Sequence, residues 1–433
     1  MTQVRINGIE HQPTGDTRAQ RLTPERLRTI VESAHLNFLI GAGTSSALFA
    51  RLGNIELALS ELADTEAPEA AKQRVRASIQ AYFFDNVLVP NCAIIDRDPS
   101  AEPVLASYAA FLRTLNRILL KRHSSLLAKQ ANLFTTNVDM VFEVALEQLG
   151  VDFSDGFSGK IRPRFDLGDF NTLRYRMGNR YEHRSEVPVF NLVKLHGSAA
   201  WKQEIRPNGR NDIYFDHGLT LVKQVDGLLT PARQHLLDVL VTPQPTGQGP
   251  TLRAVPELLA EAQNLPLLED AVAVVGAFAA GHDALGIVNP DKRKFATTVL
   301  NETYYELIRR FANELEKENS VLFVHGFSFR DEHLRDLVLR AARTNPTLQV
   351  IVFCYSRADR ATYEELLPVA EMKNGNIQLV APGEPDEGMP ERYATLDVLE
   401  SDYFAPIIRD KIPEPDQRIE LDIRTPTEEP TDA

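Results

Sequence analysis

The sequence predicts an α/β fold in which a parallel sheet is covered by helices on both faces, with helical and irregular insertions. Apolar runs of strand length alternate along the chain with longer amphipathic segments of helical period. Several of these apolar runs are continuous, which is typical of strands that are buried on both faces. We therefore expect a Rossmann-like sheet.

The composition favours a soluble globular protein, with 43% hydrophobic and 25% charged residues in a chain of 433. A net charge of −13 argues against a sequence-independent nucleic-acid binder, which needs a basic face to neutralise phosphates. A local basic patch or, more simply, a solvated basic loop is formed by Arg162, Arg164, Arg174, Arg176 and Arg180.

The chain shows no sign of a membrane or secreted protein. It has no apolar run of about 18 residues and no charged-then-apolar leader. Its two cysteines, Cys92 and Cys354, are far apart, which excludes a disulfide framework and a zinc site made of paired CxxC motifs. We expect a cytoplasmic protein without zinc.

The first half of the chain predicts two strands among helices. Residues 1–22 are polar and aperiodic, so we expect a flexible arm. Thr23-Pro24-Glu25 predicts a helix start, because it combines a capping hydroxyl, a first-turn proline and an acid. The elements that follow are a helix to about Ala34, a strand from Leu36 that breaks at Gly41 into a second helical pattern, helical residues 55–90, a loop over 90–102, a helix over 103–129, a strand ANLFTTN and a helix from Asp139 to Gly150.

The second half adds further strands and less regular insertions. Residues 151–188 and 202–290 are expected to be irregular or helical insertions. The whole of 23–400, including these insertions, is expected to form one domain. Residues 401–433 read as a largely disordered tail. The regular elements between are a strand VFNLVKLHG ending at Leu195 or His196, a helix from Leu300 to Leu315, a strand SVLFVHGFSF, a helix over 331–343 and a strand TLQVIVFCY.

Four predicted strands end in small or polar residues. In open parallel sheets, ligands bind beyond the carboxyl ends of the strands, so the coincidence predicts one binding site. The four strand ends are the turn Gly41-Ala42-Gly43-Thr44-Ser45, the segment Thr136-Asn137-Val138-Asp139, the turn His196-Gly197-Ser198 and the turn Gly326-Phe327-Ser328.

Each segment also has a purely structural interpretation. The glycine turn, whose third fingerprint glycine is replaced by Ser46, could be a plain strand-to-helix turn rather than a phosphate cradle. Asn137 could be a turn residue and Asp139 a helix cap. His196 could be an ordinary surface or core histidine, although a histidine before glycine at a strand end is approachable. The acids of Asp331-Glu332-His333 are best explained as stabilising a helix start.

The four motifs, GAGTS, TTNVD, LHG and GFS, resemble in kind and order those of the SIR2 superfamily. The segment from VNPDKRKF to RDEHLRDL is similar to bacterial SIR2-like proteins of antiphage defence, which include the partner of a HerA-type ATPase. The resemblance spans residues 36 to about 355.

The resemblance implies a role for each motif. His196 would be the catalytic base, and Asn137 and Asp139 would face the nicotinamide ribose and the nicotinamide pocket. The turn Gly41, Ala42, Gly43, Thr44 and Ser45 would cradle the NAD phosphates, and Gly326, Phe327 and Ser328 would hold the adenine ribose.

The chain departs from the deacylase members of that superfamily. Their zinc-binding cysteine pairs are missing, and Leu48-Phe49-Ala50-Arg51 stands where GIPDFR usually follows the glycine turn. The resemblance therefore implies an NAD hydrolase, a homo-oligomer that uses NAD as substrate in antiphage defence with a HerA-like ATPase. The alternatives are an NAD-dependent deacylase or ADP-ribosyltransferase, and a non-catalytic NAD-sensing subunit.

Overall fold

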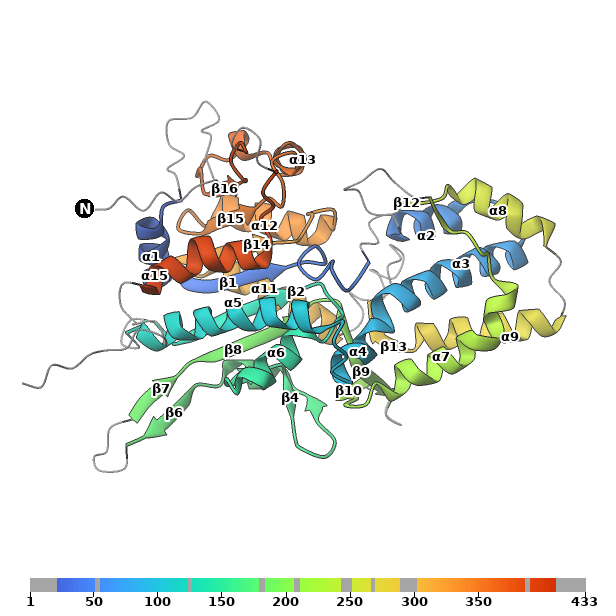
Figure 1. The fold of residues 1–433 in the computed structure, drawn as a ribbon, viewed down its shortest axis with the longest axis horizontal. Coiled ribbons are helices and arrows are strands. Elements are labelled where there is room, and N and C mark those ends of the chain that lie inside the picture. The colour runs from blue at the N-terminus through green and yellow to red at the C-terminus, as the bar shows by residue number, and fades with distance from the viewer. Residues whose placement is uncertain are drawn as a thin grey trace, which may run out of the picture.

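The central element of the fold is a parallel sheet with helices on both faces, as the sequence predicts (Figure 1). The computed structural model describes residues 22–50, 55–123, 127–178, 184–205, 211–242, 251–265, 269–288, 302–385 and 390–409. In these residues seven strands are ordered β16-β15-β14-β1-β2-β8-β3, and every neighbouring pair is parallel. The strands are β1 (His35–Ile40), β2 (Gln130–Thr135), β3 (Phe153–Ser154), β8 (Val189–Lys194), β14 (Ser320–His325), β15 (Gln349–Phe353) and β16 (Ile377–Val380).

Continuous apolar runs form these strands because both faces of the sheet are buried. On β1, Phe38 belongs to the hydrophobic cluster of one face and Leu39 to that of the other. On β2, Leu133 and Phe134 are divided in the same way. Side chains alternate between faces along a strand, so two covered faces favour apolar residues at most positions of the run. Exceptions are three buried asparagines that bond to one another across β1, β2 and β8, namely Asn37, Asn132 and Asn191.

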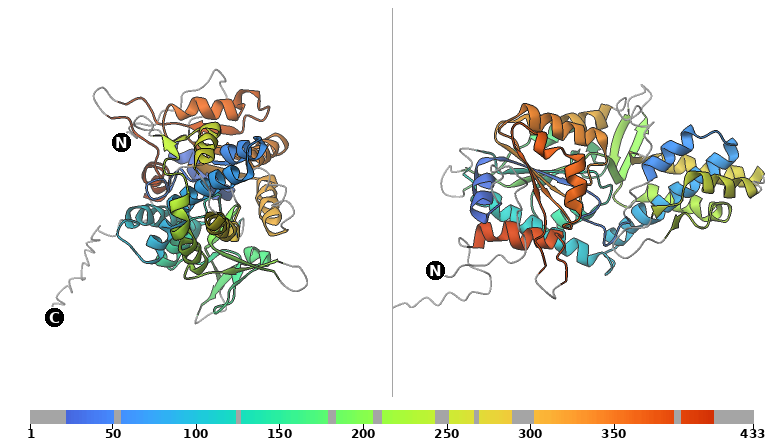
Figure 2. Two further views of the ribbon diagram at one scale, coloured as in Figure 1. Left: turned by 90° about the vertical axis from the view of Figure 1, so that its right-hand side faces the viewer. Right: turned by 90° about the horizontal axis from the view of Figure 1, so that it is seen from above.

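Two groups of helices cover the faces, and Figure 2 shows helices on both sides of the strands. One face carries α1 (Pro24–Ser33), α5 (Glu102–Lys121), α6 (Val141–Leu149), α14 (Leu396–Leu399), the π-helix η5 (Glu400–Phe404) and α15 (Ala405–Arg409). The other carries α11 (Glu302–Glu316), α12 (Glu332–Thr344) and α13 (Asp359–Leu366).

A helical lobe lies beyond the carboxyl ends of the central strands (Figure 1). It has its own hydrophobic clusters, and one of them includes Val138 and Met140, which directly follow β2. The lobe consists of α2 (Ile55–Asp64), α3 (Glu69–Phe83), the π-helix η1 (Phe84–Leu88), α4 (Pro90–Ile95), α7 (Thr220–Ala232), α8 (Val255–Asn264) and α9 (Glu269–Asp283).

Antiparallel strands fill the remaining insertions. A second sheet has the order β13-β9-β10-β5-β4, and two hairpins pair β6 with β7 and β11 with β12. The bounds are β4 (Phe157–Ser158), β5 (Arg164–Phe165), β6 (Arg174–Met177), β7 (Arg184–Val187), β9 (Gly197–Ile205), β10 (Asn211–Phe215), β11 (Val241–Thr242), β12 (Thr251–Leu252) and β13 (Leu285–Ile287), with 3-10 turns η2 (Leu167–Asn171), η3 (Arg233–His235) and η4 (Val369–Glu371).

Most predicted elements have their expected counterparts, but four boundaries were wrong. Residues 42–48 form turns rather than the start of a second helix, and the predicted loop over 90–102 contains α4. The helix predicted over 103–129 ends at Lys121, because Arg122 is extended. Residues 401–409 are helical rather than a disordered tail, since Phe404 and Ile407 are buried in the core. The insertions over 151–188 and 202–290, expected to be irregular or helical, also contain strands, and β3 joins the central sheet.

Some predictions fall outside the described residues. These are the arm over 1–21, the tail over 410–433 and residues 300–301 of the helix that appears as α11. Leu22, which we assigned to the arm, is buried.

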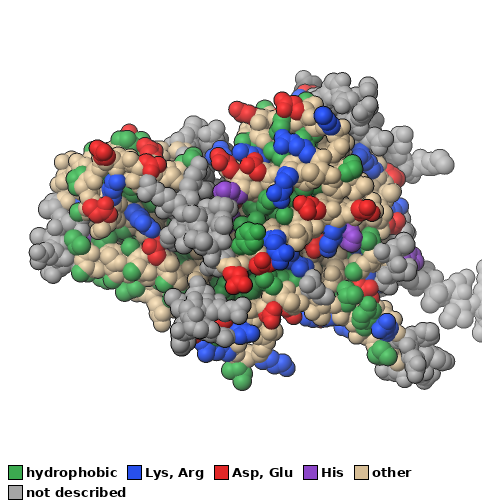
Figure 3. All heavy atoms as spheres, turned by 180° about the vertical axis from the view of Figure 1, so that it is seen from behind, with side chains coloured by type: hydrophobic (Ala, Val, Ile, Leu, Met, Phe, Trp, Pro, Cys, Tyr) green, Lys and Arg blue, Asp and Glu red, His purple; other side chains and the backbone are tan. Residues whose placement is uncertain are grey.

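Two arginines of the predicted basic patch, Arg162 and Arg174, contact other side chains. Arg162 pairs with Glu204 and lies over the ring of Tyr214, and Arg174 pairs with Asp152. Arg180 lies outside the described residues. Figure 3 shows both signs of charge interspersed on the rear face. Among the described helices, none has the length and apolar character needed to span a membrane.

Candidate functional site

All four motif segments leave the central sheet from the same row of residues. The parallel register aligns His325 of β14 with Ile40 of β1, Ile40 with Thr135 of β2, and Thr135 with Lys194 of β8. The next residues begin the Gly326, Gly41, Thr136 and Leu195 segments. Adjacent strands lie about 4.8 Å apart, so the row brings the four segments to one edge of the sheet.

This edge contains the topological switch point of the sheet. The chain continues from β1 to β2 on one side and later crosses to β14 on the other side. Loops diverge at such a point, which is where ligands bind in open parallel sheets. Asn137 and His196 lie two residues beyond the paired positions Thr135 and Lys194, so they occupy equivalent places on neighbouring strands.

The two glycine turns pack backbone against backbone. The N–H of Gly43 donates to the carbonyl of Gly326 at 2.9 Å, and that of Gly41 donates to the carbonyl of His325 at 3.0 Å. A Cβ at Gly41 would lie 2.4 Å from the oxygen of Gly326, which is too close for any side chain. These glycines are therefore required by loop-to-loop packing, a role that the sequence interpretation of a phosphate turn did not include.

The second half of the first turn, Ser45 to Ala47, offers backbone donors. In the described chain, the N–H groups of Ser45, Ser46 and Ala47 have no hydrogen-bond acceptor, whereas the carbonyl of Ser45 accepts from Leu48 and Phe49. Three successive unbonded N–H groups in a turn suit an anion such as a phosphate. The predicted helix is thus reduced to a single turn, and Ala42 beside it is exposed.

Asn137 is buried and its amide orientation is fixed. Its Nδ2 donates to the carbonyl of Gly41 and to Oγ of Ser45, both at 3.3 Å, and its backbone N–H donates to Oγ1 of Thr135 at 3.0 Å. Its Oδ1 is buried and has no partner among the described residues. Because a buried acceptor is costly to leave unpaired, Asn137 is built to accept a hydrogen bond from a ligand or a bound water.

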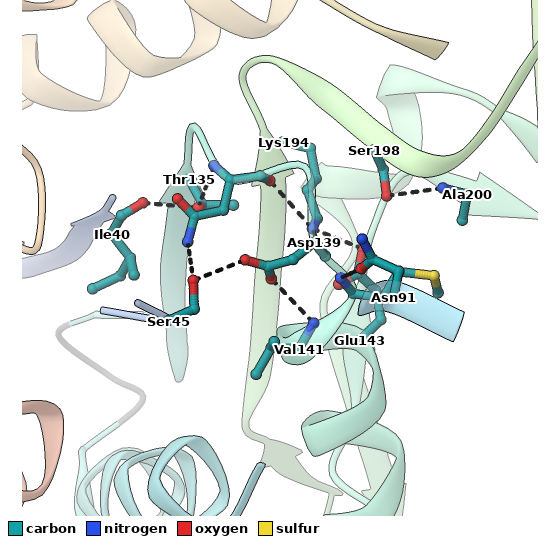
Figure 4. Close-up of polar contacts among 12 residues, drawn as sticks. Ile40, Ser45, Asn91, Thr135, Asp139, Val141, Glu143, Lys194, Ser198 and Ala200 are labelled. Carbon is teal, nitrogen blue, oxygen red and sulfur yellow. Dashed lines mark hydrogen bonds and ion pairs between the residues drawn. The ribbon is translucent and has the colours of Figure 1, made fainter. Parts of the chain in front are cut away.

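Asp139 ties the glycine turn to helix α6. Its Oδ2 accepts from Oγ of Ser45 at 3.0 Å, and its Oδ1 accepts from the N–H of Val141 at 3.2 Å (Figure 4). The carboxylate therefore contacts the first N–H of α6, but Met140 is the N-cap residue and has no side-chain cap, so the interpretation of Asp139 as the helix cap was wrong.

A buried ion pair lies beneath the Asn137 segment. The ammonium of Lys194 is 3.1 Å from Oε1 of Glu143 and also donates to the carbonyls of Asn137, at 3.4 Å, and Asp139. Figure 4 shows Lys194 and Glu143 close to Asp139. Burial raises the pKa of Glu143 to about 7, although the charge of Lys194 acts to lower it.

His196 is partly exposed and contacts a carboxylate. Its Nε2 lies 3.2 Å from Oδ2 of Asp331, with 31% and 22% of the two side chains exposed. Its carbonyl accepts from the N–H of Val288 at 2.9 Å. Gly197 has a φ of +75°, and a Cβ there would lie 2.2 Å from the oxygen of Gly286, so glycine is needed after the histidine.

The Gly326-Phe327-Ser328 turn only partly matches its expected role. The ring of Phe327 is buried and packs edge-on against Phe329, so it cannot contact a ribose. Its carbonyl accepts from the hydroxyl of Tyr363 at 2.9 Å. Ser328 is exposed and is the residue of this turn whose side chain can reach a ligand.

His325 links two site segments and was missed by the sequence analysis. Its Nδ1 is 2.8 Å from Oγ1 of Thr44, and its Nε2 is 2.8 Å from the carbonyl of Ala394. Because that carbonyl can only accept, Nε2 carries the proton and Nδ1 accepts from Thr44. Burial lowers the pKa of His325, which favours this neutral form.

The sequence offered one usable signal for the missed residues. The sequence predicts that the acids at this helix start interact with the helix dipole, and Asp331 is the N-cap of α12. Its contact with His196 joins segments 135 residues apart in sequence. Among the described residues, no three His, Cys, Asp or Glu side chains gather as metal ligands.

No family model matches the sequence, and a search of curated proteins finds no significant relative.

Proposed function

We propose that this chain is an NAD hydrolase that cleaves the bond between nicotinamide and ribose. The observation that carries the proposal is the row of four strand ends, which brings the Gly41, Asn137, His196 and Gly326 segments to one edge of the sheet. The resemblance of these four motifs to the SIR2 superfamily supplies the choice of NAD.

The side chains at this edge suit the chemistry of glycosidic hydrolysis. The bond between the nicotinamide nitrogen and C1′ breaks, and its electron pair neutralises the departing cationic ring, so the leaving group needs no acid. The transition state is oxocarbenium-like and needs an oriented nucleophile. A water that donates one hydrogen bond to Oδ1 of Asn137 would be held for attack on C1′, and His196 would take its proton.

The rest of the edge suits the remainder of the dinucleotide. The N–H groups of Ser45, Ser46 and Ala47, which have no acceptor among the described residues, would donate to the diphosphate oxygens. The hydroxyl of Ser328, on the adjacent turn, would contact the adenosine half. These assignments require no metal ion.

Removal of either catalytic side chain tests the proposal. We expect Asn137→Ala and His196→Ala each to lower NAD cleavage at least about 100-fold, which is a usual loss for a general base. His235→Ala is the control, because this histidine lies on η3, outside the sheet edge. Products are resolved by chromatography after incubation with NAD, in the presence and in the absence of a candidate HerA-type ATPase.

The product pattern also separates the alternatives. Equal amounts of nicotinamide and ADP-ribose support hydrolysis, whereas ADP-ribose attached to protein or to an acyl group supports transfer. NAD that binds and stays intact in both conditions supports a sensing subunit and rejects the hydrolase.

We further propose that the enzyme acts in antiphage defence as a homo-oligomer in the cytoplasm, by depleting NAD together with its ATPase partner. This part rests on the resemblance alone. Infection of cells that carry the wild-type chain and the ATPase should lower cellular NAD, and the Asn137→Ala chain should leave it unchanged.

A further inference from the structure

The carboxylate of Asp331 serves two segments at once. Its Oδ1 accepts from the N–H groups of His333 and Leu334, both at 3.1 Å, and so caps α12. Its Oδ2 lies 3.2 Å from Nε2 of His196. The cap uses only one oxygen, and the second oxygen lies within ion-pair distance of the histidine.

The environment of Asp331 keeps the carboxylate charged. Burial alone would raise the pKa of Asp331, but the hydrogen bond and charge of His196 and the N–H of Leu334 outweigh burial, so the pKa lies below its usual value. The positive end of the α12 dipole acts in the same direction. An ionised carboxylate is an acceptor only, so Nε2 of His196 must carry a proton.

The chain that leads to Asp331 is held in an uncommon conformation. Gly326 and Phe329 both have left-handed backbone, with φ of +66° and +56°. Such a conformation is unfavourable for a bulky residue and persists only where packing determines it. Phe329 is fully buried and lies edge-on to Phe327 and Tyr363, at ring distances of 5.0 and 6.0 Å. This packing fixes where Asp331 stands.

The histidine is fixed from its own side as well. Its carbonyl is bonded to Val288, and Gly197 forces the sharp turn that takes the chain from β8 into β9. Within the part of the chain that the structure describes, Nδ1 of the ring has no hydrogen-bond partner. Because 31% of the side chain is exposed, this nitrogen is the ring atom left for a ligand.

We infer that Asp331 is a positioning residue for His196: it fixes the ring through Nε2–H and leaves Nδ1 as the atom that takes the proton of the attacking water. This inference rests on the proposed function. When the water loses its proton to Nδ1, the imidazole becomes a cation, and the Asp331 carboxylate stabilises that cation. After product release the proton passes to solvent, and the ring returns to its neutral form.

The test replaces the charge but keeps the helix cap. Asparagine caps helices as well as aspartate does, so Asp331→Asn retains the acceptor for α12 and loses the charged acceptor for His196. We expect kcat for NAD cleavage to fall about 10- to 100-fold with KM changed less than about threefold, because the loss arises in the transition state. The acid limb of the pH profile of kcat/KM should move to lower pH, since the imidazolium loses its counter-ion.

Two further variants separate positioning from structural support. Asp331→Ser also keeps a capping oxygen and should show the same loss of kcat. Glu332→Gln removes the neighbouring acid in the first turn of α12 and should leave kcat and the pH profile unchanged. The melting temperature is measured for all three.

The outcomes distinguish this inference from the proposed function. Wild-type kcat and pH profile in Asp331→Asn and Asp331→Ser would overturn the positioning role, while an inactive His196→Ala would leave the hydrolase intact. A loss of activity that Glu332→Gln shares, or that follows a fall in melting temperature, would make Asp331 structural. Full activity in His196→Ala would reject both ideas.

Discussion

Lys194 and Glu143 act as a buried cross-link under the segment that carries Asn137. The ammonium holds two backbone carbonyls of that segment, and Glu143 on α6 compensates its charge. Both side chains are almost fully buried, so neither charge is solvated by water. A buried pair of this kind costs desolvation energy, and what it provides is a defined geometry for the groups that it contacts.

The pair predicts a pH dependence of stability. The pKa of Glu143 is raised from 4.5 to about 7 by burial, so its ionisation costs more in the folded than in the unfolded protein. The stabilisation that comes from keeping Glu143 protonated in the folded state is fully present below pH 4.5 and is lost as the pH rises through 7. We expect the free energy of unfolding of the wild type to fall by about 1–3 kcal/mol relative to Glu143→Gln between pH 5 and 7.

Urea unfolding at several pH values measures this difference. Glu147→Gln is the matched control, because Glu147 lies on the same helix and is exposed. Parallel stability curves for the wild type and Glu143→Gln would show that Glu143 stays ionised throughout this range.

The residue scale also shows where sequence reasoning stops. The candidate residues Asn137 and His196 could be found because each ends an apolar run, and strand ends meet at one edge. Gly41 and Ser45 accept hydrogen bonds from Nδ2 of Asn137, and this leaves Oδ1 as the acceptor for a ligand. The carboxylate that contacts His196 belongs to Asp331. Such contacts depend on three-dimensional packing, which no local pattern encodes.

At the scale of elements, the close contact of two glycine turns shapes the proposed phosphate site. A Cβ on Gly326 would lie 2.3 Å from Oγ1 and 2.4 Å from the N of Thr44. The left-handed φ of +66° is a second reason for glycine there. Strain and overlap together make this position the most sensitive one in the turn.

A pair of alanine variants separates the two effects. Gly326→Ala adds overlap, at about 1–3 kcal/mol, to left-handed strain of about 1–2 kcal/mol. Gly375→Ala adds the strain alone, because its φ is +57° and no atom lies within 4 Å of its Cβ position. We expect Gly326→Ala to be the less stable by urea unfolding and to lose NAD binding. Equal stability and equal binding in the two variants would contradict the packing role.

The elements themselves were predicted unevenly, for physical reasons. Strands β1, β2, β8, β14 and β15 were recognised because burial on both faces leaves continuous apolar runs. The helix expected after Gly41 is only a turn, because the segment is held by Gly326 and Asp139 rather than by its own periodicity. Short β16, with four residues, gives too little pattern to be recognised.

At the scale of the whole molecule, the helical lobe contacts the site segments through the π-helix η1 and helix α4. The carbonyl of Asn86, in the π-helix η1, accepts from Ala50, and Oδ1 of Asn91 accepts from the N–H of Met140 at 2.9 Å. A π-helix interrupts regular helical bonding and is frequent near functional sites. The lobe therefore borders both the glycine turn and the Asn137 segment. The sequence does not predict this arrangement, because the contacting residues are far apart along the chain.

The central claim is that the four strand ends form one NAD site, and a structure of His196→Ala with NAD tests it most directly. At about 1 mM NAD, the upper end of usual KM values, we expect the dinucleotide along the sheet edge. Its phosphates should lie at the N–H groups of Ser45–Ala47, and a ribose hydroxyl or water should lie about 2.7–3.0 Å from Oδ1 of Asn137. NAD bound elsewhere, or an empty edge with Asn137 still unpartnered, would contradict the account.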